Sequence, residues 1–266
     1  MKSVRERRAE KALEHTKEME QRYKESIKKA FWGSKLYYGR DSFGIKTYSR
    51  FKEPTRVQIV DSDTVTALFK NIGIKDNVAI LNFASYKYAG GGFIKGSLAQ
   101  EESLCHASTL YNVLKDMDDM FYEEHKGNLN SGLYRDEAIF SPYIKFFKSG
   151  YKPREVSVIT CAAVNRGAAK KKGITDSEVS RAMEARINFI MDIAVERGVD
   201  TLVLGAFGCG VFGNDPHEVA GYFLKYIEEH PLAFKKVVFA IPVSEKDNGN
   251  PDSNYEAFKK RLMHTL

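Results

Sequence analysis

The sequence predicts an α/β fold whose sheet is at least partly parallel. Several short runs are apolar at consecutive positions, as strands that are buried on both faces are. Between or after these runs lie stretches with apolar residues at three- and four-residue spacing, which favours helices. Strands that alternate with helices along a chain are typical of a largely parallel sheet covered by helices.

The expected elements follow one another through the chain after its first fifty residues. The expected strands are RVQIV at 56–60, VAILNF at 78–83, VSVITC at 156–161, TLVLGAF at 201–207 and VVFAI at 237–241. The expected helices cover residues 63–71, 97–114, 177–198, 216–229 and about 252–264. Each strand is followed by a turn or a helix, so the order fits the predicted fold class.

The N-terminal region predicts one long surface helix over residues 4–31. Its apolar positions recur at threes and fours with charged residues between them, the pattern of a helix that packs one stripe. Residues 115–153 show no sustained period and contain several Gly and Pro, so we expect a long ordered insertion there. We expect a single domain overall, with residues 1–50 as a helical extension packed on a core of residues 51–266.

Composition narrows the class of protein and its location. The 266 residues are 43% hydrophobic, which is ample for a buried core. No cationic start with an apolar segment and no run of about 18 apolar residues occurs, so we expect a cytoplasmic protein without membrane contact. Cys105, Cys161 and Cys209 lie far apart, and the six histidines lack ligand spacing. We therefore expect reduced thiols and no structural metal.

The charge of the chain is modestly basic. The formal net charge is +6, and in the first thirty residues ten Lys and Arg outweigh six Glu. A basic face is either simply solvated or binds a polyanion. The sequence leaves both interpretations open.

Two glycine-rich turns follow two of the expected strands. AGGGFIKGS comes after VAILNF, and GAFGCGVFGNDP begins at the end of TLVLG. Ligands of open α/β sheets bind beyond the carboxyl ends of the strands, so both turns can reach one cleft. Their N–H groups and the helices that follow favour a phosphate or diphosphate, although tight turns with positive φ are the alternative. Neither turn is a nucleoside-triphosphate loop or a dinucleotide fingerprint.

Two adjacent glutamates follow the first of these turns. Ser97 with Gln100 predicts an N-cap and capping box, and hence a helix that begins at about Leu98. Glu101 and Glu102 then fall in its first turns, where carboxylates stabilise the helix by roughly 0.3 to 1 kcal/mol. Neighbouring helical side chains point about 100° apart, which does not suit a pair that flanks one glycosidic bond. We expect one catalytic carboxylate and a neighbour that positions substrate.

Three glycines, seven intervening residues and QEE resemble the signature loop of poly(ADP-ribose) glycohydrolases. The longer stretch LNFASYKYAGGGFIKGSLAQEESLCHASTLY resembles the bacterial type of this macrodomain enzyme. Further similar stretches are IFSPYIKFF at 139–147, VSVITCAAVNRG at 156–167, GAFGCGVFGNDPHEVA at 205–220 and VVFAI at 237–241. The similarity covers roughly residues 5–266.

The resemblance implies a macrodomain-like mixed sheet sandwiched between helices, with ADP-ribose across the strand ends. It implies a glycoside hydrolase that reverses ADP-ribosylation by cleaving ribose–ribose O-glycosidic bonds of poly(ADP-ribose) and releasing ADP-ribose. Glu102 would be the general acid/base, which protonates the leaving ribose oxygen and then helps to activate water. Glu101 would bind the neighbouring ribose, and Gln100 would help to hold the loop. A positioned acid of this kind contributes about 10² to 10⁴ in rate.

The same resemblance assigns ligand binding to both glycine-rich turns and implies no metal or other cofactor. The implied ligand-binding residues are Gly90, Gly91 and Gly92 in the first turn, and Gly208, Gly210, Val211, Phe212 and Gly213 in the second. Phe212 would pack near the distal ribose, or it is a loop residue anchored in the core. Asn165 is a minor candidate that is equally explained as a turn former.

Some positions depart from the pattern of the family. Tyr88 and Ala89 stand where an Asn-Pro commonly precedes the triple glycine, Val164 replaces a proline, and Lys148 stands where arginine is expected. These changes concern substrate preference. One alternative is a mono-ADP-ribosyl hydrolase that acts on a modified protein or nucleic acid, which the basic N-terminal helix would suit. The other is a non-catalytic ADP-ribose reader, against which the retained glutamates argue. We expect a monomer.

Overall fold

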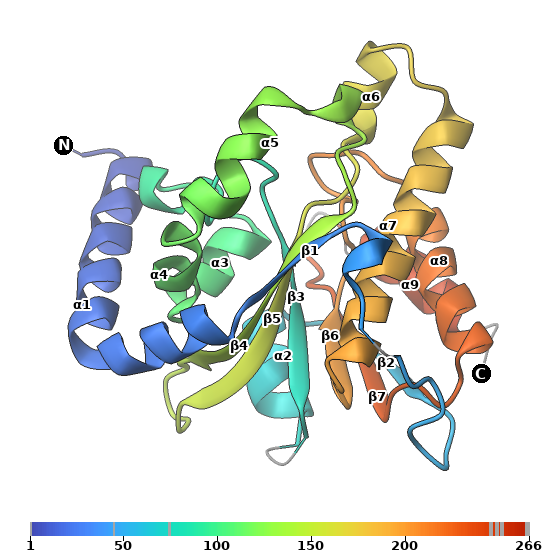
Figure 1. Cartoon of the computed structure of the whole chain (residues 1–266), viewed down its shortest axis with the longest axis horizontal. Coiled ribbons are helices and arrows are strands. Elements are labelled where there is room, and N and C mark those ends of the chain that lie inside the picture. Colours follow the sequence, from blue (N-terminus) through green and yellow to red (C-terminus); the bar gives the residue numbers. More distant parts are fainter. Residues whose placement is uncertain are drawn as a thin grey trace.

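A seven-stranded mixed sheet lies between two layers of helices (Figure 1). The computed structural model describes residues 2–44, 46–73, 76–244, 247, 250 and 253–263. The predicted α/β fold with an N-terminal helix is confirmed.

The sheet has the strand order β1-β4-β5-β3-β6-β7-β2. The strands are β1 (Lys35–Tyr38), β2 (Arg56–Val60), β3 (Val78–Phe83), β4 (Glu137–Phe146), β5 (Arg154–Cys161), β6 (Thr201–Leu204) and β7 (Lys236–Ala240). The pairs β1–β4 and β4–β5 are antiparallel, and the remaining pairs are parallel. The carboxyl ends of β5, β3, β6, β7 and β2 therefore lie along one edge.

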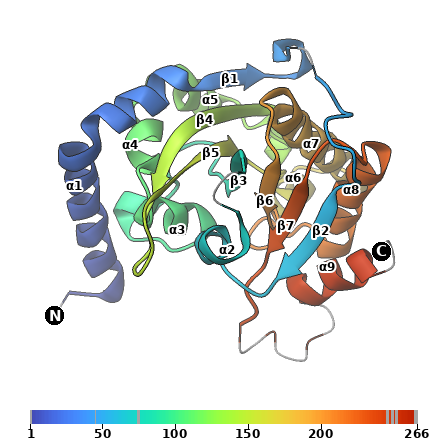
Figure 2. The same cartoon turned by 90° about the horizontal axis from the view of Figure 1, so that it is seen from below.

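Helices cover both faces of this curved sheet (Figure 2). They are α1 (Val4–Gly33), α2 (Thr64–Asn71), α3 (Gln100–His106), α4 (Leu110–Lys115), α5 (Glu123–Gly127), α6 (Arg166–Lys171), α7 (Asp176–Glu196), α8 (Pro216–Glu229) and α9 (Asn254–Met263). One face packs against α1 to α4, and the other packs against α7, α8 and α9. The molecule therefore has two cores, one on each side of the sheet.

The alternation of side chains along β3 shows why its sequence is apolar throughout. Val78 and Ile80 belong to the core beneath α1 to α4, whereas Ala79 and Leu81 belong to the core beneath α7 to α9. All four side chains are buried. A strand that is covered on both faces needs apolar residues at consecutive positions, which is why its sequence predicts it well.

Two strands were not predicted, and both lie at one side of the sheet. β4 lies inside the segment 115–153 that was expected to be a long ordered insertion, and β1 lies inside the N-terminal segment 1–50. In β4 the register with β5 shifts between Ser141 and Ile144, and Tyr143 has a φ of 61°. This irregularity interrupts the period-two alternation and so conceals the strand in the sequence.

The helix that was expected over residues 97–114 is in fact two helices, α3 and α4. Between them Ser108 forms an isolated β-bridge with Phe146. The N–H of Thr109 donates to the Lys145 carbonyl at 3.1 Å, and the N–H of Phe147 donates to the Ala107 carbonyl at 2.8 Å. Pairing with the edge of β4 therefore breaks the helix. The expected ends of the last helix, at 252 and 264, lie outside the described residues.

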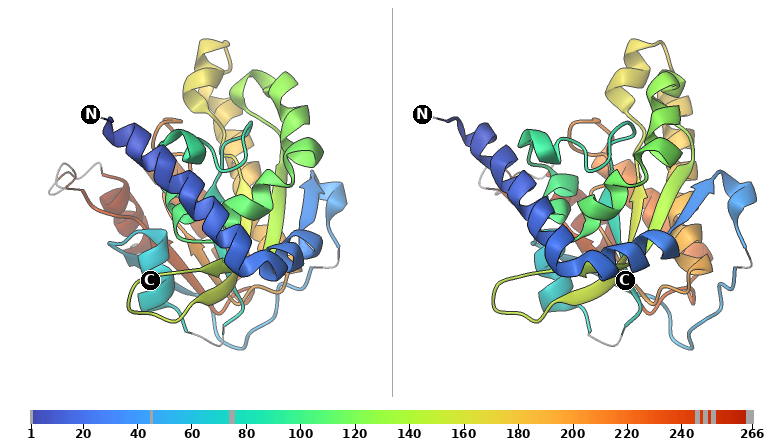
Figure 3. Two further views of the ribbon diagram at one scale, coloured as in Figure 1. Left: turned by 90° about the vertical axis from the view of Figure 1, so that its left-hand side faces the viewer. Right: turned by 60° about the vertical axis from the view of Figure 1, so that its left-hand side comes forward.

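The first helix is long and bent (Figure 3). The bend lies at Tyr23, whose φ of −129° and ψ of 26° are not helical. A capping box starts the helix, because the Ser3 hydroxyl accepts from the N–H of Glu6 at 3.2 Å and the Glu6 carboxylate accepts from the N–H of Ser3 at 2.6 Å. The division of the chain at residue 50 stays a prediction.

Three properties of the described residues bear on location and cofactors. Cys105 and Cys161 are buried free thiols, and Cys209 is a partly exposed one. No group of three or more His, Cys, Asp or Glu within the described ranges is arranged to hold a metal ion. No helix in that part of the chain is long and apolar enough to cross a membrane.

Candidate active site

A cavity of about 880 Å³ opens at the carboxyl edge of the parallel strands. Its lining comes from the turns that follow β2, β3, β5, β6 and β7. Gly91 and Gly92 line it from one side, and Gly208 and Gly210 line it from another. The prediction that the two glycine-rich turns reach one cleft is confirmed. The volume is that of a typical small-molecule site.

The first glycine-rich turn lies against both predicted carboxylates. Gly90 and Gly91 have φ values of 64° and 60°, the left-handed region that favours glycine. A Cβ atom on Gly91 would lie 2.8 Å from Glu101 Oε2 and 2.8 Å from Glu102 Oε1. Only a residue without a side chain fits there, so the turn brings bare backbone to both carboxyl groups.

The helix that carries the glutamates begins later than predicted. It starts at Gln100 rather than at Leu98, and Ser97 is not its N-cap. The N–H of Ser97 donates instead to the Gly92 carbonyl at 3.0 Å. The N-cap prediction was wrong because the tight glycine turn uses Ser97 before the helix begins.

Glu102 is held by two backbone donors from different segments. Its Oε1 accepts from the N–H of Gly92 at 2.8 Å, and its Oε2 accepts from the N–H of Ala99 at 2.8 Å. The side chain is only 6% exposed. The carboxylate is thus fixed between the triple glycine and the start of α3, with one further lone pair on each oxygen.

Glu101 is held just as firmly but in a different environment. Its Oε1 accepts from the Asn82 side-chain amide at 3.1 Å, and its Oε2 accepts from the N–H of Ser85 at 2.7 Å. Burial raises the pKa of Glu101 to about 8. The hydrogen bonds from Ser85 and Asn82 lower this pKa, and the charge of Glu102 raises it slightly, but burial is the largest effect. Glu101 therefore binds a proton near neutral pH.

Gln100 ties the start of α3 to the end of β3. Its Oε1 accepts from the N–H of Phe83 at 2.9 Å, and its Nε2 donates to the Leu81 carbonyl at 2.8 Å. Both side-chain groups thus bind the backbone of the strand. This geometry agrees with a residue that holds the loop, and its role in ligand binding stays a prediction.

The second turn is shaped by close packing around Gly208, whose φ is 74°. A Cβ atom there would lie 2.6 Å from the Ala163 Cβ and 2.6 Å from the Asn214 Nδ2. The Asn214 amide in turn donates to the Val164 carbonyl at 2.8 Å and to the Gly208 carbonyl at 3.0 Å. The buried asparagine therefore fixes the turn after β6 against the turn after β5.

Several backbone N–H groups of the second turn are available to an anion. Within the part of the chain that the structure describes, those of Gly208, Gly210, Val211 and Phe212 have no hydrogen-bond acceptor. The Val211 side chain is 99% exposed beside the cavity. Gly90 and Gly213 shape their turns through positive φ but do not line the cavity.

An aromatic stack forms one wall of the cavity. Phe212 packs edge-on against Tyr134, with ring centroids 6.1 Å apart. Tyr134 stacks on Tyr86 at 4.2 Å, and Tyr86 stacks on His125 at 4.1 Å. Phe212 is thus anchored by aromatic packing and also lines the cavity, so its two interpretations are compatible.

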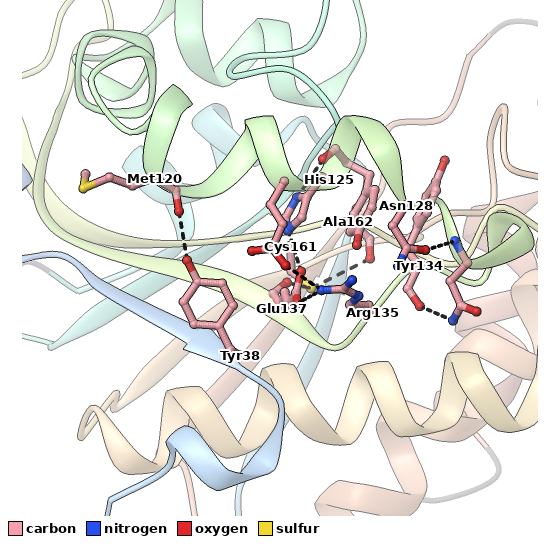
Figure 4. A network of polar contacts seen from close by, with 12 residues as sticks. Tyr38, Met120, His125, Asn128, Tyr134, Arg135, Glu137, Cys161 and Ala162 are labelled. Carbon is pink, nitrogen blue, oxygen red and sulfur yellow. Dashed lines mark hydrogen bonds and ion pairs between the residues drawn. The ribbon is translucent and has the colours of Figure 1, made fainter.

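A buried polar pair supports this stack from behind (Figure 4). His125 Nε2 lies 2.5 Å from Glu137 Oε2, and both side chains are buried. His125 Nδ1 also contacts the Tyr86 carbonyl at 3.0 Å. Burial alone raises the pKa of Glu137, but His125 and Arg135 outweigh it and hold that pKa below its ordinary value. The pair fixes α5, and with it Tyr86, against β4.

A buried arginine from α7 holds the other tyrosine loop. Arg186 donates through Nε to Asp136 Oδ1 at 2.6 Å and through Nη2 to the Leu133 carbonyl at 3.2 Å. It also donates to the carbonyl of Ala162. These bonds bracket Tyr134, so the segment before β4 is anchored on the end of β5.

Sequence reasoning missed several residues of the site. Asn82 carried a usable signal, because it is a polar residue inside the apolar run VAILNF and buried polar groups need a partner. No signal in the sequence pointed to Tyr86, Tyr134 and His125, since only tertiary packing brings them together. Asn165 is the N-cap of α6, where its Oδ1 accepts from the N–H of Ala168 at 2.9 Å. It also lines the cavity, so its role in ligand binding stays a prediction.

Together the fold and the site define a class of protein. A cavity lies across the carboxyl ends of parallel strands, between two glycine-rich turns. Two buried carboxyl groups stand at one end of the cleft, where they border a single glycine. This arrangement suits acid catalysis on a phosphate-containing substrate.

Comparisons with known proteins identify the family. The family described as microbial-type PARG, catalytic domain, matches residues 6–149. The poly(ADP-ribose) glycohydrolase structure from Thermomonospora curvata is 32% identical, with 97% of this chain and 100% of that chain covered and a TM-score of 0.82. The structure of that enzyme bound to the inhibitor ADP-HPD is 31% identical, with 97% of this chain and 100% of that chain covered and a TM-score of 0.81.

A second bacterial enzyme agrees. Poly(ADP-ribose) glycohydrolase from Deinococcus radiodurans in complex with ADP-ribose is 31% identical, with 90% of this chain and 98% of that chain covered and a TM-score of 0.78. No curated protein sequence matches the chain significantly. The chain belongs to the microbial-type PARG family, and it is an enzyme that hydrolyses glycosidic bonds.

Proposed function

We propose that this enzyme hydrolyses the ribose–ribose O-glycosidic bonds of poly(ADP-ribose) and releases ADP-ribose, with Glu102 as its general acid/base. The observation that carries the proposal is the meeting of Glu101 and Glu102 at Gly91, at one end of the cleft. Family membership supports the substrate, because related structures are poly(ADP-ribose) glycohydrolases, one of them in complex with ADP-ribose.

The seating of the ligand follows from the shape of the cleft. The diphosphate lies between the two glycine-rich turns, where the N–H groups of Gly208, Gly210, Val211 and Phe212 have no acceptor within the described ranges. The distal ribose then lies at the two glutamates. The adenosine end extends toward the turns after β2 and β7, where Asp63, Ile241 and Pro242 line the cavity.

The chemical step uses the fixed position of Glu102. Protonated Glu102 gives its proton to the leaving ribose oxygen while the bond from that oxygen to the anomeric carbon breaks. The anomeric centre develops oxocarbenium character and is attacked by water, whose proton returns to Glu102. Glu101 binds a hydroxyl group of the reacting ribose and is oriented by Asn82 and Ser85.

The proposal is tested by release of ADP-ribose from poly(ADP-ribose), with the affinity for ADP-ribose measured in parallel. Glu102→Gln keeps the size of the side chain but removes the acid, so turnover should fall at least about a hundredfold. ADP-ribose binding should change little. Glu53→Gln is the matched control, because Glu53 is an exposed residue before β2, at the opposite edge of the sheet.

The outcomes discriminate between the three candidate activities. Turnover that survives in Glu102→Gln would refute the role of this residue. A wild-type protein that binds ADP-ribose but does not cleave the polymer would point to a mono-ADP-ribosyl hydrolase, which is then tested on mono-ADP-ribosylated protein and nucleic acid. Binding without turnover on any of these substrates would define a reader.

We also propose a cytoplasmic monomer with a macrodomain fold, in which residues 51–266 form the catalytic core. Free thiols at Cys105, Cys161 and Cys209 support a reducing location. The mixed sheet between helices, with its cleft at the strand ends, supports the macrodomain assignment.

A further inference from the structure

An exposed tyrosine surrounded by lysines stands at the edge of the cleft. The Tyr88 side chain is 45% exposed. The ammonium nitrogens of Lys87, Lys95 and Lys126 lie 5.6, 5.3 and 5.6 Å from the centroid of its ring. We call these four residues the Tyr88 cluster.

Hydrogen bonds connect the Tyr88 cluster to the acid through a single turn. The Tyr88 carbonyl accepts from the N–H of Gly91 at 3.0 Å, and the Gly92 carbonyl accepts from the N–H of Lys95 at 3.0 Å. The N–H of Gly92 itself donates to Glu102. Tyr88, Lys87 and Lys95 also line the cavity. The cluster is therefore adjacent to the place where the glycosidic bond breaks.

Two of the three lysines carry charge that no carboxylate neutralises. Lys126 forms ion pairs with Glu123 and, at 3.5 Å, with Asp118. Within the described ranges, Lys87 and Lys95 form no ion pair. The cluster thus presents an aromatic face beside two unpaired ammonium groups, a combination that suits a base joined to phosphates.

The side of the cleft matters for what can bind there. In the proposed binding mode the released ADP-ribose extends from Glu102 toward the turns after β6, β7 and β2. Lys87 and Tyr88, just before the triple glycine, and Lys95, just after it, line the cavity at the opposite end of that path. In poly(ADP-ribose) the leaving oxygen belongs to the adenosine ribose of the adjoining unit. That ribose also carries an adenine ring and a 5′-diphosphate. Both groups of the adjoining unit must therefore lie close to Glu102 when the bond breaks.

We infer that the Tyr88 cluster is a binding subsite for the adjoining ADP-ribose unit, on the leaving-group side of the bond. Adenine stacks on Tyr88, and Lys87 and Lys95 bind its diphosphate. This inference rests on the proposed function, and it gives the enzyme a preference for a polymer over a substrate with a single ADP-ribose unit.

The test compares ligands that differ only in the presence of the second unit. Affinities for purified ADP-ribose oligomers and for ADP-ribose are measured on the Glu102→Gln protein, so that the oligomer is not cleaved. Adding Tyr88→Ala should weaken oligomer binding about tenfold, as the loss of one stacked base does. Adding Tyr88→Trp should restore it. In both Tyr88 variants the affinity for free ADP-ribose should stay within about twofold of the parent, because a single ADP-ribose unit does not reach the proposed subsite.

Salt dependence tests the two lysines. Lys87→Gln with Lys95→Gln should weaken oligomer binding about tenfold at low salt and should lower the slope of log affinity against log salt by about 1.4. Lys52→Gln with Lys152→Gln is the matched control. Both of these exposed lysines precede strands at the opposite edge of the sheet, and the charge change is the same. The control should bind the oligomer like the parent.

Two results would overturn the inference. One is equal oligomer affinity in the parent, Tyr88→Ala and Lys87→Gln/Lys95→Gln proteins. The other is a single-stranded oligoadenylate that binds as tightly as the oligomer and loses the same affinity in both variants, which would assign the cluster to nucleic acid. The proposed function is tested separately, by turnover of poly(ADP-ribose) by the wild-type protein. If the wild type is inactive but its oligomer binding still depends on Tyr88, the proposed hydrolysis is refuted and the proposed subsite is supported.

Discussion

At the scale of the residue, two sequence neighbours occupy different environments. Glu102 accepts from the backbone N–H groups of Gly92 and of Ala99, the residue before α3. Glu101 instead faces the buried end of β3 and the turn after it. The angle of about 100° between adjacent helical side chains produces this separation. In the proposed mechanism this separation leaves Glu102 for proton transfer and Glu101 for positioning the substrate.

The raised pKa of Glu101 predicts a particular pH dependence of stability. Between its ordinary value of 4.5 and about 8, the folded protein keeps a proton that the unfolded chain has released. The free energy of unfolding should therefore fall as pH rises through this window, by about 2 to 5 kcal/mol. Glu101→Gln should remove this component, which is measured by urea unfolding at several pH values across the window.

Interpretation of this experiment depends on the difference between two profiles. Other groups titrate in the same range, so the wild-type curve minus the Glu101→Gln curve is the informative quantity. Glu53→Gln, in which an exposed carboxylate is replaced, should give a curve parallel to the wild type. If the Glu101→Gln curve is also parallel, Glu101 is ionised like an ordinary surface carboxylate.

At the scale of the element, α1 packs directly on the segment between the triple glycine and α3. The Arg5 guanidinium donates to the Lys95 carbonyl at 3.0 Å. A Cβ atom on Gly96 would lie 2.1 Å from the Arg5 carbonyl oxygen and 3.0 Å from the Ala9 nitrogen. The segment between the triple glycine and α3 is thus pressed against the first turns of α1, which supports the position of Glu102.

Gly96→Ala should therefore damage both stability and activity. The substitution adds left-handed backbone strain of about 1 to 2 kcal/mol and overpacking of about 1 to 3 kcal/mol. Displacement of the loop should lower kcat/KM at least about tenfold. Gly173→Ala is the control, because Gly173 follows α6, also has a positive φ, of 80°, does not line the cavity and has nothing within 4 Å of the added atom.

Chemical denaturation and steady-state kinetics on both variants separate strain from packing. Gly173→Ala should show the backbone strain alone, with full activity. Equal losses of stability and activity in the two variants would mean that the contact between α1 and the loop is unimportant for the site.

At the scale of the whole molecule, the N-terminal helix is part of a core. Ala12, Met19, Ile27 and Ala30 are buried in the cluster that covers one face of the sheet. Leu13 lies on the other side of the helix and is 49% exposed. The extension therefore should not unfold on its own, and the protein should behave as one cooperative unit.

Met19→Ala tests this cooperativity. Because Met19 is 5% exposed, its truncation should lower the free energy of unfolding by about 2 to 4 kcal/mol. Far-ultraviolet and near-ultraviolet circular dichroism should report one shared transition in urea. Leu13→Ala, at the exposed position, should change stability by less than about 0.5 kcal/mol. Two separate transitions, of which only the first shifts in Met19→Ala, would show an independent helix.

The sequence by itself determined the features that rest on local or nearest-neighbour patterns. The five parallel strands were predictable because burial on both faces requires continuous apolar runs, and α8 was predicted over the residues that it occupies, 216–229. The meeting of the two glycine-rich turns at one cleft followed from the rule for parallel strand ends. Glu101 and Glu102 lie in the first turn of a helix, as predicted, although that helix begins at Gln100 rather than at about Leu98.

Only the tertiary structure decided the features that depend on contacts between distant segments. β4 was concealed by its register shift, and the expected helix over 97–114 is split because its centre pairs with β4. The Tyr86, Tyr134 and His125 stack and the Tyr88 cluster join residues whose local sequence gives no periodic signal. The raised pKa of Glu101 likewise comes from burial, which depends on how the whole chain packs around a side chain.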